Sequence, residues 1–268
     1  MRQVSGVHGD HGVHASRQDV LYVAARAPRP GFTKSRLGRS IGHRRATALY
    51  SAFVQDLAAR LDRAPFTVGW YVTPDDAWSE LAPLMPVSQG WGGDLGPILA
   101  QPAGDWTERQ RALFATAAAR QELRTVLIAS DSPQLGLELM VEAFERLEHD
   151  DLVLGPTDDG GYYLVGMRAP SHPGMARPWE VLSGVRMSTG TVFDELLSRA
   201  TGLGLQTSLI PPTFDIDEAA DLGRLFPLAL HRDDLAATRA ALDTLGLLPV
   251  LTDAGVRRPD TAVALGGA

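Results

Sequence analysis

Apolar positions along the chain alternate between runs typical of buried strands and spacings typical of amphipathic helices. Residues 125–129, Thr-Val-Leu-Ile-Ala, are aliphatic or β-branched without polar alternation, which predicts a strand buried on both faces. Similar runs lie at 20–25 and 66–72, and apolar side chains recur at helical spacing over 44–61 between them. This order of strand, helix and strand predicts the start of a doubly wound α/β sheet.

The same patterns predict the remaining elements. Helices are expected at 106–120, 135–147, 188–200, 219–226 and 234–245, and strands before 156, at 162–165 and at 206–210. Thr107 is expected to cap the first of these helices, Pro133 to occupy the first turn of the second, and Pro227 to end the fourth. Residues 73–104 and 171–186 are expected to be irregular, the former as a lid, a binding loop or a disordered segment.

Composition is that of a globular protein. The chain has 268 residues, of which 44% are hydrophobic and 21% charged. We expect a single domain over 19–247, with a disordered N-terminal tail at 1–18 and a C-terminal tail at 248–268. The histidines of the first tail lie in a flexible, glycine-rich setting, which disfavours a functional metal site there.

Charge and residue usage exclude several classes of protein. A net charge of −7 disfavours non-specific binding to nucleic acid or anionic membranes, which requires clustered lysine and arginine. The absence of cysteine excludes disulfides, thiolate metal sites and a cysteine nucleophile. No apolar run is long enough to span a bilayer, and the N-terminus lacks the apolar core of a signal peptide, so we expect a cytoplasmic protein. The oligomeric state is not indicated.

Asp131 lies just past the end of the predicted strand at 125–129, in the run Ser-Asp-Ser-Pro. Ligands of open parallel α/β sheets collect outside the carboxyl ends of the strands, so this carboxylate could hold a divalent cation against phosphate oxygens. Aspartate is also a common helix cap. Cap and metal ligand therefore remain equally open for this residue.

A basic loop follows the first predicted strand. Prolines and Gly31 turn the backbone, while Arg26, Arg29, Lys34 and Arg36 gather positive charge. Such a loop can surround a polyphosphate, with lysine as a point charge and arginine as a bidentate fork. It is neither a Walker A loop nor the dinucleotide-binding fingerprint. A solvated basic turn is the alternative.

An acidic turn follows the strand that ends before residue 156. It contains Asp158, Asp159, Gly160 and Gly161 and leads into Tyr162. Glycines can adopt positive φ and allow a ligand to approach the backbone, so the turn could bind a sugar or a base. Asp-Gly is also a strong hairpin signal. The two interpretations do not exclude each other.

A second acidic pair lies past the last predicted strand. Asp215 and Asp217 are two residues apart, so they point to the same side of an extended chain. Together with Asp131 they form the carboxylate set expected for a Mg²⁺ or Mn²⁺ ion that bridges two phosphates.

Several longer motifs contain these residues. They are Ala25-Arg-Ala-Pro-Arg-Pro-Gly-Phe-Thr-Lys-Ser-Arg-Leu37, then Gln101, Gly104, Asp105, Glu108 and Arg109, then Ala129-Ser-Asp-Ser-Pro133, then Asp159-Gly-Gly-Tyr-Tyr-Leu164, and last Asp215 and Asp217. In this order they resemble the motifs of DUF2064 proteins, the transferases associated with radical-SAM and selenodomain genes. The phospholactate and phosphoenolpyruvate guanylyltransferases are more distantly similar.

The chain departs from that family pattern in a few places. Met187 replaces a tryptophan in the family's Trp-Ser-Thr motif, which removes an aromatic platform before Ser188 and Thr189. Arg26 replaces a lysine, and Ala129 replaces a glycine.

The resemblance implies a glycosyltransferase-A (nucleotide-diphospho-sugar transferase) type fold, a three-layer α/β/α sandwich around a mostly parallel sheet. It also implies residue roles. Catalytic residues would be Lys34, Arg36, Asp131 and Asp159. Nucleotide would contact Ala25, Arg26, Gly31, Lys34, Arg36, Gln101, Gly104 and Ser130. The second substrate would contact Asp158, Asp159, Gly160, Gly161, Tyr162, Ser188 and Thr189, and the metal would be held by Asp131, Asp215 and Asp217.

Three functions fit these roles. The first is a metal-dependent nucleotidyltransferase that joins an NTP to a phosphorylated small molecule and releases pyrophosphate. The second is a glycosyltransferase that uses a nucleotide-diphospho-sugar, with Asp158 or Asp159 as base for the acceptor hydroxyl. The basic loop favours the first, because a departing pyrophosphate needs more positive charge. A non-catalytic nucleotide sensor is the least favoured, because the acids at both strand ends are intact.

Overall fold

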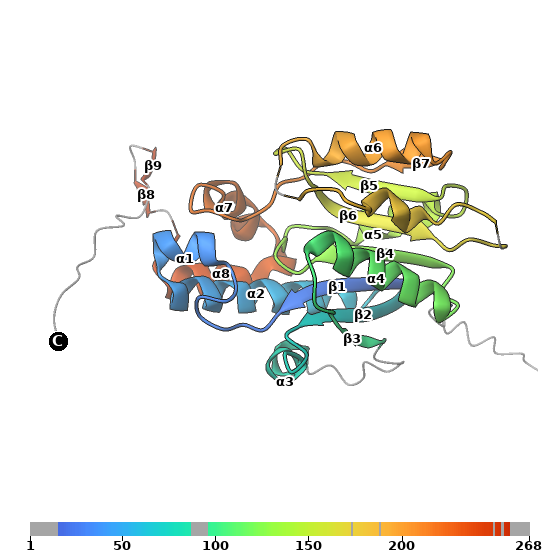
Figure 1. Ribbon diagram of the computed structural model, residues 1–268. Helices are drawn as coiled ribbons and strands as arrows, with labels where there is room; N and C mark the ends of the chain where they lie inside the picture. Colours follow the sequence, from blue (N-terminus) through green and yellow to red (C-terminus); the bar gives the residue numbers. More distant parts are fainter. Residues whose placement is uncertain are drawn as a thin grey trace, which may run out of the picture.

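The computed structural model describes residues 16–86, 96–172, 174–187, 189–248, 250–252 and 255–257, and Figure 1 shows the arrangement of the elements. Over this part of the chain the main sheet has seven strands in the order β3-β2-β1-β4-β6-β5-β7. The strands are β1 (Ser16–Arg26), β2 (Phe66–Thr73), β3 (Ile98–Ala100), β4 (Arg124–Ala129), β5 (Leu152–Pro156), β6 (Tyr162–Arg168) and β7 (Thr207–Leu209), with a separate pair, β8 (Val250–Thr252) and β9 (Gly255–Arg257).

Helices connect and cover these strands. They are α1 (Ser35–Ile41), α2 (His43–Leu61), α3 (Trp78–Leu81), α4 (Trp106–Ala119), α5 (Leu137–Arg146), α6 (Val192–Gly202), α7 (Leu222–His231) and α8 (Ala236–Thr244), with 3₁₀ turns η1 (Ala82–Leu84), η2 (Pro178–Leu182) and η3 (Asp233–Leu235). None of the helices in the described ranges combines the length and apolarity that a membrane span requires.

Strand direction decides where a ligand can bind. β1 pairs in parallel with β2 on one side and with β4 on the other, whereas β6 is antiparallel to both β4 and β5. The chain runs outward from β1 through β2 to β3, then returns to the other side of β1 as β4. The topological switch point therefore lies between the carboxyl ends of β1 and β4, which is where open α/β sheets bind ligands.

The sheet is covered on both faces. One apolar cluster joins the sheet to α2 and α5, through residues such as Val54 and Phe144. The other joins it to α4, η2 and α6, through residues such as Phe114 and Leu196. The prediction of a three-layer α/β/α sandwich around a mostly parallel sheet is confirmed.

The C-terminal helices form an additional layer against the N-terminal ones. A third apolar cluster unites α1 and α2 with α7 and α8, which lie together in Figure 1. The first N–H groups of α8 donate to the buried carboxylate of Asp56 on α2, at 2.9 Å from Ala237 and 2.7 Å from Thr238. This satisfies amide groups that a helix start leaves unpaired.

Several expected boundaries are wrong for identifiable reasons. α4 is capped by Asp105 rather than Thr107, because Asp105 and Glu108 form a reciprocal capping box. Pro133 precedes α5, which begins only at Leu137. Pro227 lies inside α7, where it is exposed, because the apolar face of that helix continues beyond it to Ala229.

Short elements inside the expected loops were not predicted. α3, η1 and β3 lie within 73–104, and η2 lies within 171–186. β1 begins at Ser16, inside the expected N-terminal tail, because this end of the strand still pairs with Phe66 of β2. The other expected residues of that tail, 1–15, lie outside the described part of the chain, as does most of the segment after 248.

Candidate functional site

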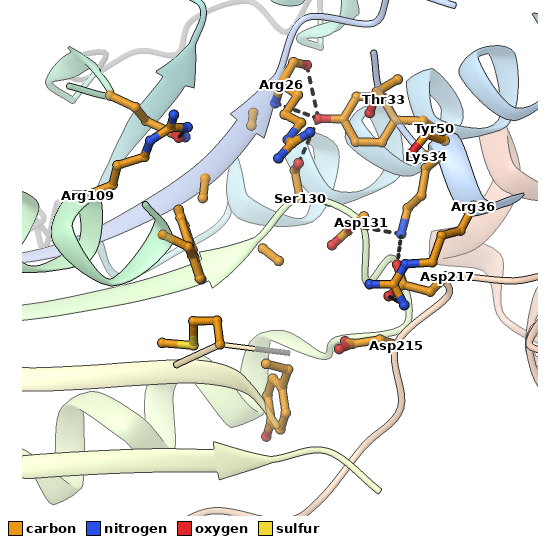
Figure 2. Close-up of a pocket in the computed structure, with 18 of the residues that line it drawn as sticks. Arg26, Thr33, Lys34, Arg36, Tyr50, Arg109, Ser130, Asp131, Asp215 and Asp217 are labelled. Carbon is orange, nitrogen blue, oxygen red and sulfur yellow. Dashed lines mark hydrogen bonds and ion pairs between the residues drawn. The ribbon is translucent and has the colours of Figure 1, made fainter. Parts of the chain in front are cut away.

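A pocket of 590 Å³ opens at the edge of the sheet where β1 and β4 end, and Figure 2 shows the residues around it. The predicted nucleotide and metal residues that line it are Ala25, Arg26, Lys34, Arg36, Gln101, Gly104, Ser130, Asp131, Asp215 and Asp217. Gly31 does not line the pocket; its φ of 80° serves the turn of the basic loop. The strand-end acids and the basic loop thus meet in one cavity.

Lys34 is the most enclosed charged group of this pocket. Its backbone is left-handed, with φ 48°, at the start of α1, and its side chain is only 3% exposed. The ammonium nitrogen lies 2.7 Å from Asp131 Oδ2 and 3.3 Å from Asp217 Oδ1, and it donates to the carbonyl of Ile216. The lysine therefore joins the loop after β4 to the segment after β7 (Figure 2).

The charges of this cluster shift pKa values in opposite senses. Burial by itself lowers the pKa of Lys34, but the charges of Asp131 and Asp217 outweigh it, so the pKa is raised and the ammonium stays protonated. Burial, followed by repulsion from Asp131 and Asp217, raises the pKa of Asp215 to about 7. Asp215 accepts from the Ser132 hydroxyl at 3.3 Å.

Asp131 does not cap a helix. The residue at the start of α5 is Gly136, five positions further on, and Asp131 instead faces Lys34. Arg36 stands beside this pair, with a nitrogen 3.2 Å from Asp217, and its side chain is 57% exposed. It is therefore free to reorient toward a ligand, whereas Lys34 is fixed.

The basic loop does not direct all its charge into the pocket. Arg29 turns away and pairs with Asp76 at 2.9 Å and with Glu80 of α3. It is not among the residues that line the cavity. The expectation that Arg29 contributes to a polyphosphate site is therefore wrong. Its ion pairs instead fix the basic loop to the neighbouring helix.

Tyr50 of α2 links the two strand ends beneath the pocket. Its hydroxyl oxygen accepts from the amide of Arg26 at 3.0 Å and lies 2.8 Å from the Ser130 hydroxyl. Burial raises the pKa of this phenol to about 12, so it stays neutral. Sequence reasoning missed Tyr50, because a helical tyrosine with apolar neighbours gives no signal of such a contact.

The far end of the pocket is formed around Arg109. Its Nε donates to the carbonyl of Gly104 at 2.9 Å, and its Nη1 lies 3.3 Å from the amide oxygen of Gln101. Gln101 in turn donates to the carbonyl of Tyr71 at 2.8 Å. Within the described part of the chain Arg109 forms no ion pair with an acidic side chain, and it lies well apart from Lys34 in Figure 2. The motif at 101–109 contained it, but its role was not predicted.

The acidic turn lies beside the pocket rather than in it. Asp159 accepts from the Thr157 hydroxyl at 2.6 Å and from the amide of Gly161 at 3.1 Å, and the first of these bonds lowers its pKa. Asp158 pairs with Arg224 at 2.7 Å. These acids stabilise the turn and its surroundings, and neither lines the cavity.

The glycines of this turn serve packing. Gly160 has φ 84°, and a Cβ there would lie 2.1 Å from the carbonyl oxygen of Gly190, whereas Gly161 does not have positive φ. Tyr162 does line the pocket, with its hydroxyl bonded to the side chain of Gln110. Thr189 does not line it, and Ser188 lies outside the described residues.

The carboxylates of the pocket fit a cation that is held jointly with a ligand better than a cation held by the protein alone. In the described ranges, no three His, Asp or Glu side chains are grouped closely enough to hold a metal ion. Mg²⁺, however, is usually held by one or two carboxylates together with substrate phosphates. Because the single ammonium of Lys34 contacts both Asp131 and Asp217, these two carboxylates are near enough to share such an ion with a ligand.

Comparison with known proteins shows first the fold and then a family that part of the chain resembles. A crystal structure from Desulfovibrio desulfuricans G20, of a protein provisionally named a nucleotide-diphospho-sugar transferase, is 28% identical, with a TM-score of 0.71 over 85% of this chain and 96% of that one. The fold is therefore of the nucleotide-diphospho-sugar transferase type. Residues 70–189 match the family described as "Uncharacterized protein conserved in bacteria (DUF2064)", which confirms the resemblance to DUF2064 proteins.

Other similarities are more distant. A cytidylyltransferase from Leptospira borgpetersenii is 12% identical, covering 87% of this chain and 94% of that one, with a TM-score of 0.48. CMP:2-keto-3-deoxy-manno-octonic acid synthetase complexed with CTP is 11% identical, covering 79% and 98%, with a TM-score of 0.48. No curated protein matches the chain at significant similarity.

Proposed function

We propose that this protein is a nucleotide-using transferase, and specifically a metal-dependent nucleotidyltransferase that joins an NTP to a phosphorylated small molecule and releases pyrophosphate. The observation that carries the proposal is the buried ammonium of Lys34 facing Asp131 and Asp217 at the switch point of the sheet. The similarity to the Desulfovibrio desulfuricans protein supports the broader class.

The chain's own groups act mainly by positioning and charge. Lys34 and Arg36 bind the phosphates that become pyrophosphate, and Asp131 with Asp217 or Asp215 would hold Mg²⁺ or Mn²⁺. The ion, when bound, neutralises charge on the α-phosphate and on the leaving group. A phosphate oxygen of the acceptor attacks the α-phosphorus, and the bond to pyrophosphate breaks. No protein nucleophile is required.

The placement of the turn acids supports nucleotidyl rather than glycosyl transfer. An acceptor phosphate is already ionised and needs no base, whereas an acceptor hydroxyl must lose a proton. Asp159 is engaged by Thr157 and Gly161, and Asp158 by Arg224. Neither acid is free to act as that base.

A glycosyltransferase is the second candidate, because the similar Desulfovibrio desulfuricans protein carries that kind of name. In that reaction Asp158 or Asp159 would have to leave its present partner, Arg224 or Thr157, to accept the proton of the acceptor hydroxyl.

A thermal-shift panel in Mg²⁺ or Mn²⁺ tests the two candidates, because a ligand that binds only the folded state raises its apparent stability. The four NTPs are compared with UDP- and GDP-sugars. Stabilisation by an NTP, followed by pyrophosphate release with phosphorylated acceptors, is the expected result. Stabilisation by a nucleotide-sugar and its NDP, with no response to any NTP, would establish the second candidate instead.

A further inference from the structure

Arg60 of α2 is a buried guanidinium outside the pocket. Its side chain is 6% exposed, and its Nη1 donates to two carbonyls of the loop after β4, Pro133 at 2.9 Å and Leu135 at 2.8 Å. The other face of the guanidinium binds the carboxylate of Asp234 in η3, with Nε 2.8 Å from Oδ2. One side chain thus fixes two carbonyls of the loop that carries Asp131.

Arg232 completes this contact from the end of α7. Its Nη1 donates to the carbonyl of Gln134 at 2.6 Å, and its Nε and Nη2 bind the same Asp234 carboxylate at 2.9 and 2.6 Å. Three consecutive carbonyls, 133 to 135, are therefore held by two arginines that share one aspartate. We call Arg60, Arg232 and Asp234 the arginine brace.

The braced loop is also bonded to the second acidic segment. The Gln134 side chain donates to the carbonyl of Phe214 and lies 3.5 Å from the Thr213 hydroxyl. Ser132, on the same loop, donates to Asp215 at 3.3 Å. The position of the loop that carries Asp131 is thereby coupled to the segment that carries Asp215 and Asp217.

Stability alone is a poor explanation of this arrangement. Burial lowers the pKa of Arg60, and Asp234 only partly compensates for the lost hydration. A buried ion pair often contributes little net stability compared with apolar side chains of similar size. The planar guanidinium of an arginine, by contrast, fixes two acceptors at defined angles, which a lysine cannot do.

We propose that Arg60 is a positioning residue: through the arginine brace it sets the separation of Asp131 from Asp215 and Asp217, and so the geometry in which the pocket binds a metal–diphosphate group. The proposal rests on the proposed function, because it takes a metal–diphosphate group as the ligand of the pocket. Groups that orient the ligands of a metal typically change its affinity by about 10–100-fold when they are removed.

Two variants of the full-length protein test it, Arg60→Lys and Arg232→Gln. The probe is inorganic pyrophosphate with Mg²⁺, measured by calorimetry. Arg232 is 30% exposed, so its variant keeps the fold even if the buried Arg60→Lys protein does not. Arg146→Gln is the matched control, because it removes an exposed ion pair with Glu142 on α5. Circular dichroism and thermal unfolding confirm that each protein is folded.

We expect the folded brace variants to bind magnesium pyrophosphate at least about 10-fold more weakly than the wild type, with the control unchanged. Hydrogen exchange should increase in both 131–136 and 213–217 without global unfolding. Wild-type affinity in a folded brace variant, or faster exchange in 131–136 alone, would overturn the proposal. If the wild type bound no magnesium pyrophosphate while exchange rose in both segments, the proposed function would fail and the coupling would stand.

Discussion

Lys34 Nζ lies 2.7 Å from Asp131 Oδ2, and the two residues come from opposite sides of the switch point of the sheet. The lysine follows β1, and the aspartate follows β4. Because the ammonium is buried, this contact is screened less by water than a surface ion pair. The pair therefore occupies the place where a substrate's phosphates and their counter-ion would compete for the same charges.

Replacing Lys34 by glutamine should have opposite effects on two ligands. Magnesium pyrophosphate should bind at least 10-fold more weakly, whereas Mg²⁺ alone should bind more tightly, because the carboxylates of Asp131 and Asp217 lose their ammonium partner. Losing the ammonium should also lower stability, by less than the roughly 3–5 kcal/mol of a fully buried pair, because the side chains of Asp131 and Asp217 are 35% and 39% exposed. Calorimetry with each ligand checks this, with Arg44→Gln on the exposed face of α2 as control. Equal Mg²⁺ affinity in the variant and the wild type would contradict it.

Asp131→Asn should abolish transferase activity while leaving the fold intact. The amide keeps the shape of the side chain but loses the charge that faces Lys34 and a bound cation, so we expect a loss of at least about 100-fold in turnover. Asp243→Asn, at an exposed position of α8, is the control. Pyrophosphate release and circular dichroism are measured on both. A folded, fully active Asp131→Asn protein would show that the Asp131 carboxylate is not needed for catalysis.

The free energy of unfolding should fall as pH rises from about 4 to about 7. The pKa of Asp215 is raised from 3.8 to about 7 in the folded state, so the folded protein binds more protons than the unfolded chain in that window. Protonation of Asp215 therefore stabilises the folded state below this pH window, and this stabilisation is lost as Asp215 ionises with rising pH. Urea unfolding at pH 5 and pH 8 without metal measures the difference, which should be smaller in Asp215→Asn. An identical pH difference in the two proteins would show that Asp215 does not titrate in this way.

Arg109→Gln should weaken nucleotide binding about 10-fold, because the side chain lines the pocket and forms no ion pair with an acid of the described ranges. Arg111→Gln is a matched control on the same helix, since Arg111 pairs with Glu180 at 2.8 Å and does not line the pocket. Calorimetry uses whichever nucleotide stabilises the wild type most. The assignment of this pocket end fails if the two variants bind alike.

Gly160→Ala should destabilise the fold by more than Gly184→Ala. Both residues have positive φ, at 84° and 71°, so an alanine is strained at either position. Only at Gly160 would the new Cβ meet backbone, 2.1 Å from Gly190; nothing lies within 4 Å at Gly184. We expect about 1 kcal/mol for Gly184→Ala and clearly more for Gly160→Ala, measured by urea unfolding. Equal losses would mean that the turn does not pack against 189–191 in solution.

The sequence predicted the parts of the site that follow from strand direction. Carboxyl ends of parallel strands meet at one edge, so Asp131 and Asp215 could be brought together from their positions after apolar runs. Lys34 was likewise predicted from the basic loop. These inferences depend only on local pattern and on the rules of α/β topology.

What could not be predicted depends on contacts between distant segments. Arg29 and Lys34 are equivalent by charge, and only the placement of α3 shows that Arg29 pairs with Glu80 outside the pocket. Tyr50 and Arg60 act through hydrogen bonds to backbone atoms 24 to 75 positions away. Every residue has a backbone carbonyl, so the residue types do not show which carbonyl accepts a hydrogen bond. No sequence motif therefore marks Tyr50 or Arg60.

The family match covers 70–189, yet the ion pair of Lys34 with Asp131 and Asp217 draws on chain from both sides of that stretch. A fragment cut at those limits would keep Asp131 and lose the ammonium that faces it, along with the β1 strand that supports both. It would also lose Arg60, Arg232 and Asp234, and with them the whole arginine brace. Truncation at the borders of sequence similarity would thus yield a protein that keeps Asp131 but has neither Lys34 nor Arg36.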